Sequence, residues 1–204
     1  MAQERGGEER RFRRVCVFCG SSEGNRPEYA AAAREIGEVL AGEGIDLVYG
    51  GASVGLMGEM AKAVLDHGGH VFGVTVTALR EKEPPALEIP DLIVVASMHQ
   101  RKQQMADMSD AFIALPGGLG ALEQFFEIVT WEQLGLHSKP CGILNVAGYF
   151  DALETFLDHA VEEGFIAEHH RTMILVDDDP RRLLERLRRY RPEEAEHWIG
   201  RTNR

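Results

Sequence analysis

Short apolar runs alternate with stretches of helical periodicity along most of this chain, and this alternation limits the possible folds more than any other feature. The runs are nearly continuous in apolar residues, which is typical of strands buried on both faces of a parallel sheet. Strands and helices in strict alternation indicate a sheet that is covered by helices. The sequence therefore predicts an α/β protein with a Rossmann-like, doubly wound parallel sheet and helices on both faces.

The same patterns give approximate bounds for the elements. The expected strands are residues 15–18, 47–49, 71–76, 92–95, 111–115, 141–144 and 173–176. The expected helices are residues 27–43, 55–67, 98–109, 121–134, 150–163 and 180–189, and residues 77–90 are expected to form a loop.

The chain of 204 residues suits one domain, which we assign to residues 14–190. Residues 1–13 are polar and rich in Gly, Glu and Arg, and we expect them to form a disordered N-terminal extension. Residues 191–204 are expected to form a polar C-terminal tail.

The net charge of the chain argues against nucleic acid as a partner. The formal net charge is −11, which argues against nucleic-acid binding because that relies on a basic surface. Arginines crowd both ends of the chain, and we interpret both groups as solvated faces.

No apolar run is long enough to span a membrane, and the N-terminus lacks the apolar segment of a secretory signal. Three cysteines, an odd and low number, indicate reduced thiols, so we expect a cytoplasmic protein.

Metal and cofactor sites are not expected. Cys16 and Cys19 lie three residues apart in an expected strand, so their side chains should point to opposite faces of the sheet. None of the eight histidines has a zinc-binding spacing. The chain has neither an ATPase P-loop nor a dinucleotide fingerprint after its first strand. None of its four lysines has a recognisable pyridoxal-phosphate context, which argues against a decarboxylase.

Loops rich in glycine or hydroxyl groups follow several of the expected strands. They are residues 20–22, 50–55, 97–102 and 116–121. In doubly wound folds ligands bind beyond the carboxyl ends of the strands, where these loops should lie on one rim. Glycine lets backbone N–H groups approach a ligand closely, and a following helix adds N–H donors and a positive dipole end. Any one of these loops could be a simple tight turn, but together they predict a site for the phosphate of a small nucleotide.

Two basic residues, Arg101 and Lys102, belong to the loop at 97–102 and the helix that follows it. One interpretation is that they are surface charges. Their place just after a strand favours a ligand role, since arginine offers a planar fork to phosphate or ribose oxygens.

These loops resemble the Lonely Guy (LOG) family of cytokinin riboside 5′-monophosphate phosphoribohydrolases, whose members were long mislabelled as lysine decarboxylases. The resemblance covers residues 14–190. The matching segments are 19–22, 50–52, 55–58, 98–102, 116–120, 130–131, 133–135, 139–140, 145 and 148–149. It implies a Rossmann-like fold, a homodimer, and cleavage of the N-glycosidic bond of a nucleoside 5′-monophosphate to free base and ribose 5-phosphate. AMP and N6-prenylated AMP are the substrates it suggests.

The resemblance also implies which residues form the site. Catalytic roles fall to Arg101 and to position 124. Substrate or phosphate contacts fall to Ser21, Gly51, Met98, Lys102, Gly117, Gly118, Leu119, Gly120 and Ala121. The family signature P-G-G-x-G-T-x-x-E begins here at Pro116, but its threonine is Ala121 and its glutamate is Gln124.

The change at position 124 affects the chemistry directly. N-glycosidic cleavage passes through an oxocarbenium-like state at the ribose. A carboxylate can stabilise that positive charge, activate a water molecule, or act as the nucleophile. An amide carries no charge and cannot act as a base. We therefore expect a slow or altered hydrolase, with Glu127 as a possible substitute and Glu59 as another. The alternatives are a structural role for Glu127, a nucleotide-binding protein that has lost hydrolysis, or a module for another phosphate-bearing ligand.

The helix expected at residues 121–134 carries a wide apolar surface. Its members are Leu122, Phe125, Phe126, Val129 and Trp131. They could pack only in the core, or could also contact a second copy of the chain. The resemblance favours a homodimer with the site near the interface.

Overall fold

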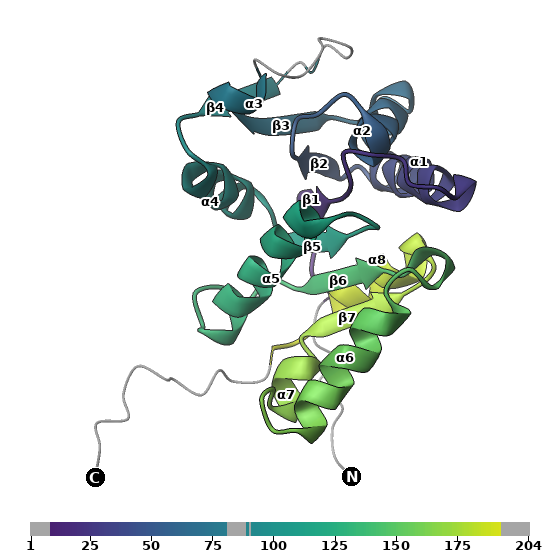
Figure 1. Ribbon diagram of the computed structural model, residues 1–204. Helices are drawn as coiled ribbons and strands as arrows, with labels where there is room; N and C mark the ends of the chain where they lie inside the picture. Colours follow the sequence, from purple (N-terminus) through teal and green to yellow (C-terminus); the bar gives the residue numbers. More distant parts are fainter. Residues whose placement is uncertain (1–8, 81–88, 90, 193–204) are drawn as a thin grey trace.

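The fold is a single seven-stranded sheet in the order β4-β3-β2-β1-β5-β6-β7, with every neighbouring pair parallel. The computed structural model describes residues 9–80, 89 and 91–192. Figure 1 shows the strands running through the middle of the molecule, with helices on both sides. The predicted α/β, Rossmann-like class is confirmed.

The strands are β1 (Arg14–Phe18), β2 (Asp46–Tyr49), β3 (Val71–Val76), β4 (Asp91–Val95), β5 (Ala111–Ala114), β6 (Cys141–Leu144) and β7 (Ile174–Asp177). The α-helices are α1 (Pro27–Gly42), α2 (Gly55–Asp66), α3 (Thr77–Arg80), α4 (Met98–Met108), α5 (Leu119–Gln133), α6 (Asp151–Glu162), α7 (Glu168–Arg171) and α8 (Pro180–Arg189). A short 3₁₀ turn, η1, covers Val146–Gly148.

The structure differs from the predicted elements mainly in four short segments. The loop expected at 77–90 begins with helix α3, and its residues 81–88 and 90 lie outside the described residues. Helix α7 and turn η1 were not predicted, because three or four residues are too few to show a helical period. Helix α5 begins at Leu119, two residues earlier than expected, so the end of the Gly-rich loop is already helical.

Two apolar cores lie on the two faces of the sheet. The first packs α1, α2 and α8 against alternate strand residues such as Val15 and Val17. The second packs α4, α5 and α6 against the intervening residues, such as Cys16 and Phe18. Cys16 and Cys19 belong to different cores, as the strand period predicted, and both thiols are buried and free.

The described part of the N-terminal segment contacts the folded domain. Residues 1–8 of the expected extension lie outside the described residues, as do residues 193–204 of the expected tail. Phe12 is buried in the first core, and the N–H of Arg13 donates to the Oδ2 of Asp110 at 2.7 Å. None of the helices in residues 9–80 and 91–192 is both long and apolar enough to cross a bilayer.

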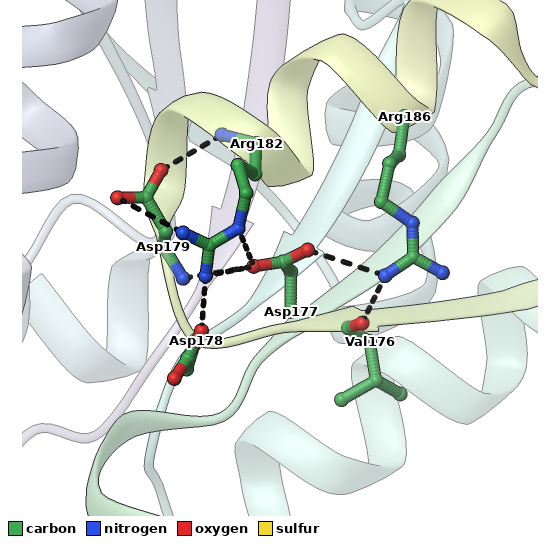
Figure 2. A network of polar contacts seen from close by, with 6 residues as sticks. All are labelled: Val176, Asp177, Asp178, Asp179, Arg182 and Arg186. Atoms are coloured by element: carbon green, nitrogen blue, oxygen red, sulfur yellow. Dashed lines mark hydrogen bonds and ion pairs between the residues drawn. The ribbon is translucent and has the colours of Figure 1, made fainter.

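Two arginines near the end of the chain hold α8 to the end of β7. Arg182 and Arg186 both contact the carboxylate of Asp177, at 3.0 Å and 3.3 Å (Figure 2). The Oδ1 of Asp179 accepts the N–H of Arg182 at 2.8 Å and caps the helix. Burial opposes ionisation of Asp177, but the N–H of Asp179 and the two guanidinium groups outweigh it and lower the pKa of this carboxyl. These two arginines are exposed to solvent and also attach α8 to the end of β7.

Candidate active site

The loops after β1 and β5 meet at the point where the strand order reverses. Strands β2 to β4 lie on one side of this pair and strands β6 and β7 on the other. The N–H of Gly20 donates to the carbonyl of Pro116 at 3.0 Å, so the two loops are in direct contact. A Cβ on Gly117 would lie 2.9 Å from the nitrogen of Gly20, which explains the glycine at this position. A reversal point of this kind is where doubly wound folds bind their ligands.

A cavity of about 420 Å³ opens at this place. Its size is within the range of pockets that bind small molecules. The predicted site residues that line it are Ser21, Met98, Arg101, Gly118, Leu119, Gly120, Ala121 and Gln124. Elements far apart in the sequence, the β1 loop, α4 and the start of α5, are thus brought together as expected.

Part of the cavity wall was missed by the sequence reasoning. These residues are Val17, Phe18, Cys19, Gly20, Gly50, Ala52, Met57 and Leu79. Cys19, Gly20, Gly50, Ala52 and Met57 all lie in segments that resemble the LOG family, which was a usable signal. The end of β1 is apolar like any buried strand, and α3 was not predicted, so these parts of the wall gave no signal. The apolar side chains among them give the cavity an apolar side.

Arg101 is only 5% exposed and lies in the wall of the cavity. Its Nε donates to the carbonyl of Val74 at 2.7 Å, and its Nη2 donates to the carbonyl of Gly50 at 3.0 Å. Val74 lies within β3 and Gly50 directly follows β2, so the backbone of the sheet and of the turn after β2 fixes the guanidinium group. The alternative that Arg101 is a surface charge is wrong.

Lys102 is also buried, but it points from α4 to α5 and is not part of the cavity lining. Its Nζ lies 2.5 Å from the Oε1 of Glu123 and 2.9 Å from the Oε2 of Glu127. Burial alone would lower the pKa of Lys102, but the two carboxylates outweigh it and raise the pKa. The surface-charge interpretation is wrong for this residue too, and its predicted phosphate role finds no support in its position.

The wall of the cavity contains no carboxylate among the residues that the structure describes. Gln124 occupies the position of the family glutamate and faces the cavity. Glu127, the possible substitute, pairs with Lys102 outside the lining, and Glu59 pairs with Arg34 at 2.6 Å. No group of three or more His, Cys, Asp or Glu side chains within the described ranges could hold a metal ion.

Two predicted glycines lie beside the cavity and not in its wall. Gly51 adopts a positive φ of 81°, and a Cβ there would lie 3.0 Å from the Cδ1 of Leu92. Gly117 lines a second, adjoining cavity of about 270 Å³. The two cavities share Gly20, Ser21 and Gly118 in their walls.

The Gly-rich loop is held from outside by Tyr149. The hydroxyl of Tyr149 donates to the carbonyl of Gly117 at 2.7 Å, and its ring meets the ring of Tyr29 edge-on. Asn145 organises the turn that presents Tyr149: its Nδ2 donates to Asp151 at 2.7 Å and its Oδ1 accepts the N–H of Phe150 at 2.8 Å. These contacts give a structural reason for the asparagine and tyrosine that resemble the family.

The sequence was compared with families of known proteins. Residues 57–187 match the family model described as "possible lysine decarboxylase". A probable cytokinin riboside 5′-monophosphate phosphoribohydrolase of Oryza sativa subsp. japonica is 51% identical over 187 residues, covering 92% of this chain and 82% of that protein. A cytokinin riboside 5′-monophosphate phosphoribohydrolase of Arabidopsis thaliana is 51% identical over 183 residues, covering 90% of this chain and 84% of that protein.

Solved structures confirm the fold. The molybdenum cofactor carrier protein of Chlamydomonas reinhardtii superposes with a TM-score of 0.65 at 21% identity, covering 88% of this chain and 98% of that one. The molybdenum cofactor binding protein of Rippkaea orientalis gives a TM-score of 0.64 at 22% identity, covering 86% and 94%. Because more than half of the chain matches the family model and its relatives are 51% identical over about nine-tenths of it, this chain belongs to the LOG family.

Proposed function

We propose that this protein cleaves the N-glycosidic bond of a nucleoside 5′-monophosphate, AMP or an N6-prenylated AMP, to free base and ribose 5-phosphate. One observation carries the proposal: Arg101, Gln124 and the start of α5 line a single cavity at the switch point. Relatives at 51% identity are named for this reaction on cytokinin riboside 5′-monophosphates.

Each part of the cavity has a role in this reaction. The backbone N–H groups at the start of α5 and the hydroxyl of Ser21 bind the 5′-phosphate. The guanidinium group of Arg101 binds phosphate or ribose oxygens and orients the sugar. The apolar wall near Met57 and Leu79 holds the base. Gln124 lies where the charge of the ribose develops, and an amide stabilises that charge less than a carboxylate does.

The test is release of free base from AMP and from isopentenyladenosine monophosphate, followed by chromatography. The wild type and Gln124→Glu are compared, with thermal unfolding as a folding control. We expect the variant to be faster by about 10²–10⁴-fold, which is the usual contribution of a positioned acid or base. Arg101→Ala should reduce base release in both backgrounds. Equal turnover by wild type and Gln124→Glu would contradict the assigned role of position 124.

A second candidate function is nucleotide binding without hydrolysis. Gln124 and Ala121 together favour it, since both replace polar groups of the family signature while the loop backbone is kept. Tight binding of AMP by a wild type without turnover, with turnover restored in Gln124→Glu, would support this function. A thermal-shift panel of nucleoside monophosphates and sugar phosphates tests the further possibility of another phosphate-bearing ligand, because a bound ligand stabilises the native state.

We infer that the protein forms a homodimer. The support is an apolar groove of about 370 Å³ between α5 and α6, where Phe126 and Leu153 lie beside Phe156, which is 63% exposed. Sedimentation velocity over a concentration series should give the mass of two chains, and Phe156→Glu should shift it toward one. A single-chain mass at every concentration would contradict the dimer.

We also propose a cytoplasmic location, because three buried free thiols suit a reducing compartment. Fractionation of cells that express the full chain tests this, and recovery in a membrane or secreted fraction would contradict it.

A further inference from the structure

The charge in the cavity differs from that of a usual glycoside-cleaving site. Such sites carry carboxylates that stabilise the oxocarbenium-like state and activate water. Here the described lining has no carboxylate, and Arg101 supplies a buried positive charge at its wall. Among the residues that the structure describes, the lining is therefore suited to anions and has no carboxylate to take a proton from water.

The side chain of Gln124 adds to this difference. An amide has two N–H donors and one carbonyl acceptor, whereas an ionised carboxylate only accepts. A carboxylate at position 124 would repel an incoming anion at short range in a partly buried site. The amide can instead donate a hydrogen bond to an oxyanion. Glutamine at position 124 thus makes water a poorer nucleophile, because no carboxylate activates it. It also removes a negative charge that would repel an incoming anion.

Two cavities adjoin at the switch point. The main cavity of about 420 Å³ and the second one of about 270 Å³ meet at Gly20, Ser21 and Gly118. The second cavity is lined by the carboxylate of Glu23, so we place an acceptor anion in the main cavity, beside Arg101 and Gln124.

On these grounds, and resting on the proposed function, we propose that inorganic phosphate is a glycosyl acceptor in this site. A phosphate oxygen forms a bond to C1′ of the ribose as the bond from C1′ to the base nitrogen breaks. The electron pair of the broken bond stays on the base, which takes a proton from solvent. The products are free base and ribose 1,5-bisphosphate. Phosphate is already anionic at neutral pH, so this step needs no general base.

The test uses the full chain with AMP and a titration of inorganic phosphate at constant ionic strength. Sulfate is the matched control, since it has the same shape and a similar charge but is a poor nucleophile. Base release is followed by chromatography, and the sugar product by phosphorus NMR, which separates ribose 1,5-bisphosphate from ribose 5-phosphate. The same series is run on Gln124→Glu, with thermal unfolding to show that both proteins are folded.

We expect phosphate, but not sulfate, to raise base release by the wild type about tenfold or more, with ribose 1,5-bisphosphate as product. Gln124→Glu should release base without phosphate and yield ribose 5-phosphate. Wild-type base release that does not depend on phosphate would overturn this proposal and leave the hydrolase standing. Base release by Gln124→Glu alone, whether or not phosphate is present, would overturn both this proposal and hydrolysis by the wild type.

Discussion

The side chain of Arg101 is held in the cavity wall by backbone carbonyl groups. Its guanidinium group donates to two backbone carbonyls, those of Val74 in β3 and of Gly50 just after β2. A buried charge is tolerated only when it is paired or hydrogen-bonded, and these carbonyls meet that need. The position of the guanidinium group therefore depends on the residues that surround it, and above all on Gly50.

Gly50→Ala tests this dependence. A Cβ at this position would lie 2.5 Å from the Nη2 of Arg101 and 2.9 Å from the sulfur of Met57, so the guanidinium group must move. A displacement of about 1 Å at a reacting site can cost about 10²-fold in rate. We expect a loss of that order in base release, measured in the wild type and in Gln124→Glu. The clash is with the ends of side chains and not with the backbone, so we expect the variant to stay folded, which thermal unfolding checks.

The matched control is Gly42→Ala, at the end of α1, where a Cβ would meet nothing within 4 Å. Alanine in a helix is equal to or better than glycine by up to roughly 1 kcal/mol. Base release should stay at the wild-type level in this variant. Normal activity in Gly50→Ala would mean that the proposed role of Arg101 does not depend on its present position.

At the scale of elements, the Gly-rich loop is held between two elements that the sequence places far apart. The β1 loop contacts it through the hydrogen bond from Gly20 to Pro116, and the turn before α6 contacts it through Tyr149. The turn contains Ala147 at a φ of 51°, a conformation that is uncommon for a residue other than glycine. The network around Asn145 keeps this turn in place, so the shape of the Gly-rich loop depends on residues outside the signature.

Tyr149→Phe removes the hydroxyl and keeps the ring. The lost hydrogen bond to Gly117 is worth about 1 kcal/mol. If the loop binds phosphate, the affinity for AMP should fall about fivefold, which corresponds to that energy. Titration calorimetry measures the change. Tyr29→Phe is the control, because its ring lines the same small cavity but its hydroxyl has no hydrogen bond to the described residues. An equal loss of affinity in both variants would show that the hydroxyl of Tyr149 is not the cause.

At the scale of the whole molecule, the C-terminal end of the described chain is attached to α5 through the buried carboxyl group of Glu132. The hydroxyl of Tyr190 donates to the Oε1 of Glu132 at 2.8 Å, and Glu132 is only 2% exposed. Burial raises the pKa of Glu132 to about 7, and the contacts with Tyr190, Cys141 and Arg10 offset this only in part. Folding therefore favours the protonated form of this group.

This has a consequence for the stability of the molecule. Because the pKa of Glu132 is higher in the folded state than in the unfolded state, folding binds a proton between about pH 4.5 and pH 7. The contribution of this group to stability is thus fully present at low pH and falls as the pH rises through that window. The loss is complete above about pH 7 and amounts to roughly 3 kcal/mol.

Glu132→Gln removes the titration and keeps an oxygen for Tyr190. We expect the variant to be more stable than the wild type at pH 8, with a smaller difference at pH 5, in urea unfolding at both pH values. Glu185→Gln, an exposed glutamate of α8, is the control and should leave the pH dependence unchanged. A wild type and Glu132→Gln with parallel stability profiles would contradict the raised pKa.

The sequence by itself determined the fold class, the parallel strands and most element bounds, because continuous apolar runs and helical periods are local properties that persist in the folded chain. It also determined that Ser21, Arg101 and the 118–121 segment meet at one rim, since the carboxyl ends of parallel strands share an edge. Gln124 was readable as a departure from the family signature.

Only the tertiary structure decided which charges face the cavity. Arg101 and Lys102 are neighbours in the sequence, yet one lies in the cavity wall and the other between two carboxylates of α5. Consecutive helical residues point about 100° apart, so the way in which α4 packs on the sheet decides the role of each. The short elements α3, α7 and η1, the support from Tyr149 and the burial of Glu132 all depend on contacts between residues distant in the sequence. Such contacts leave no periodic pattern in the chain, and only the packed molecule brings these groups together.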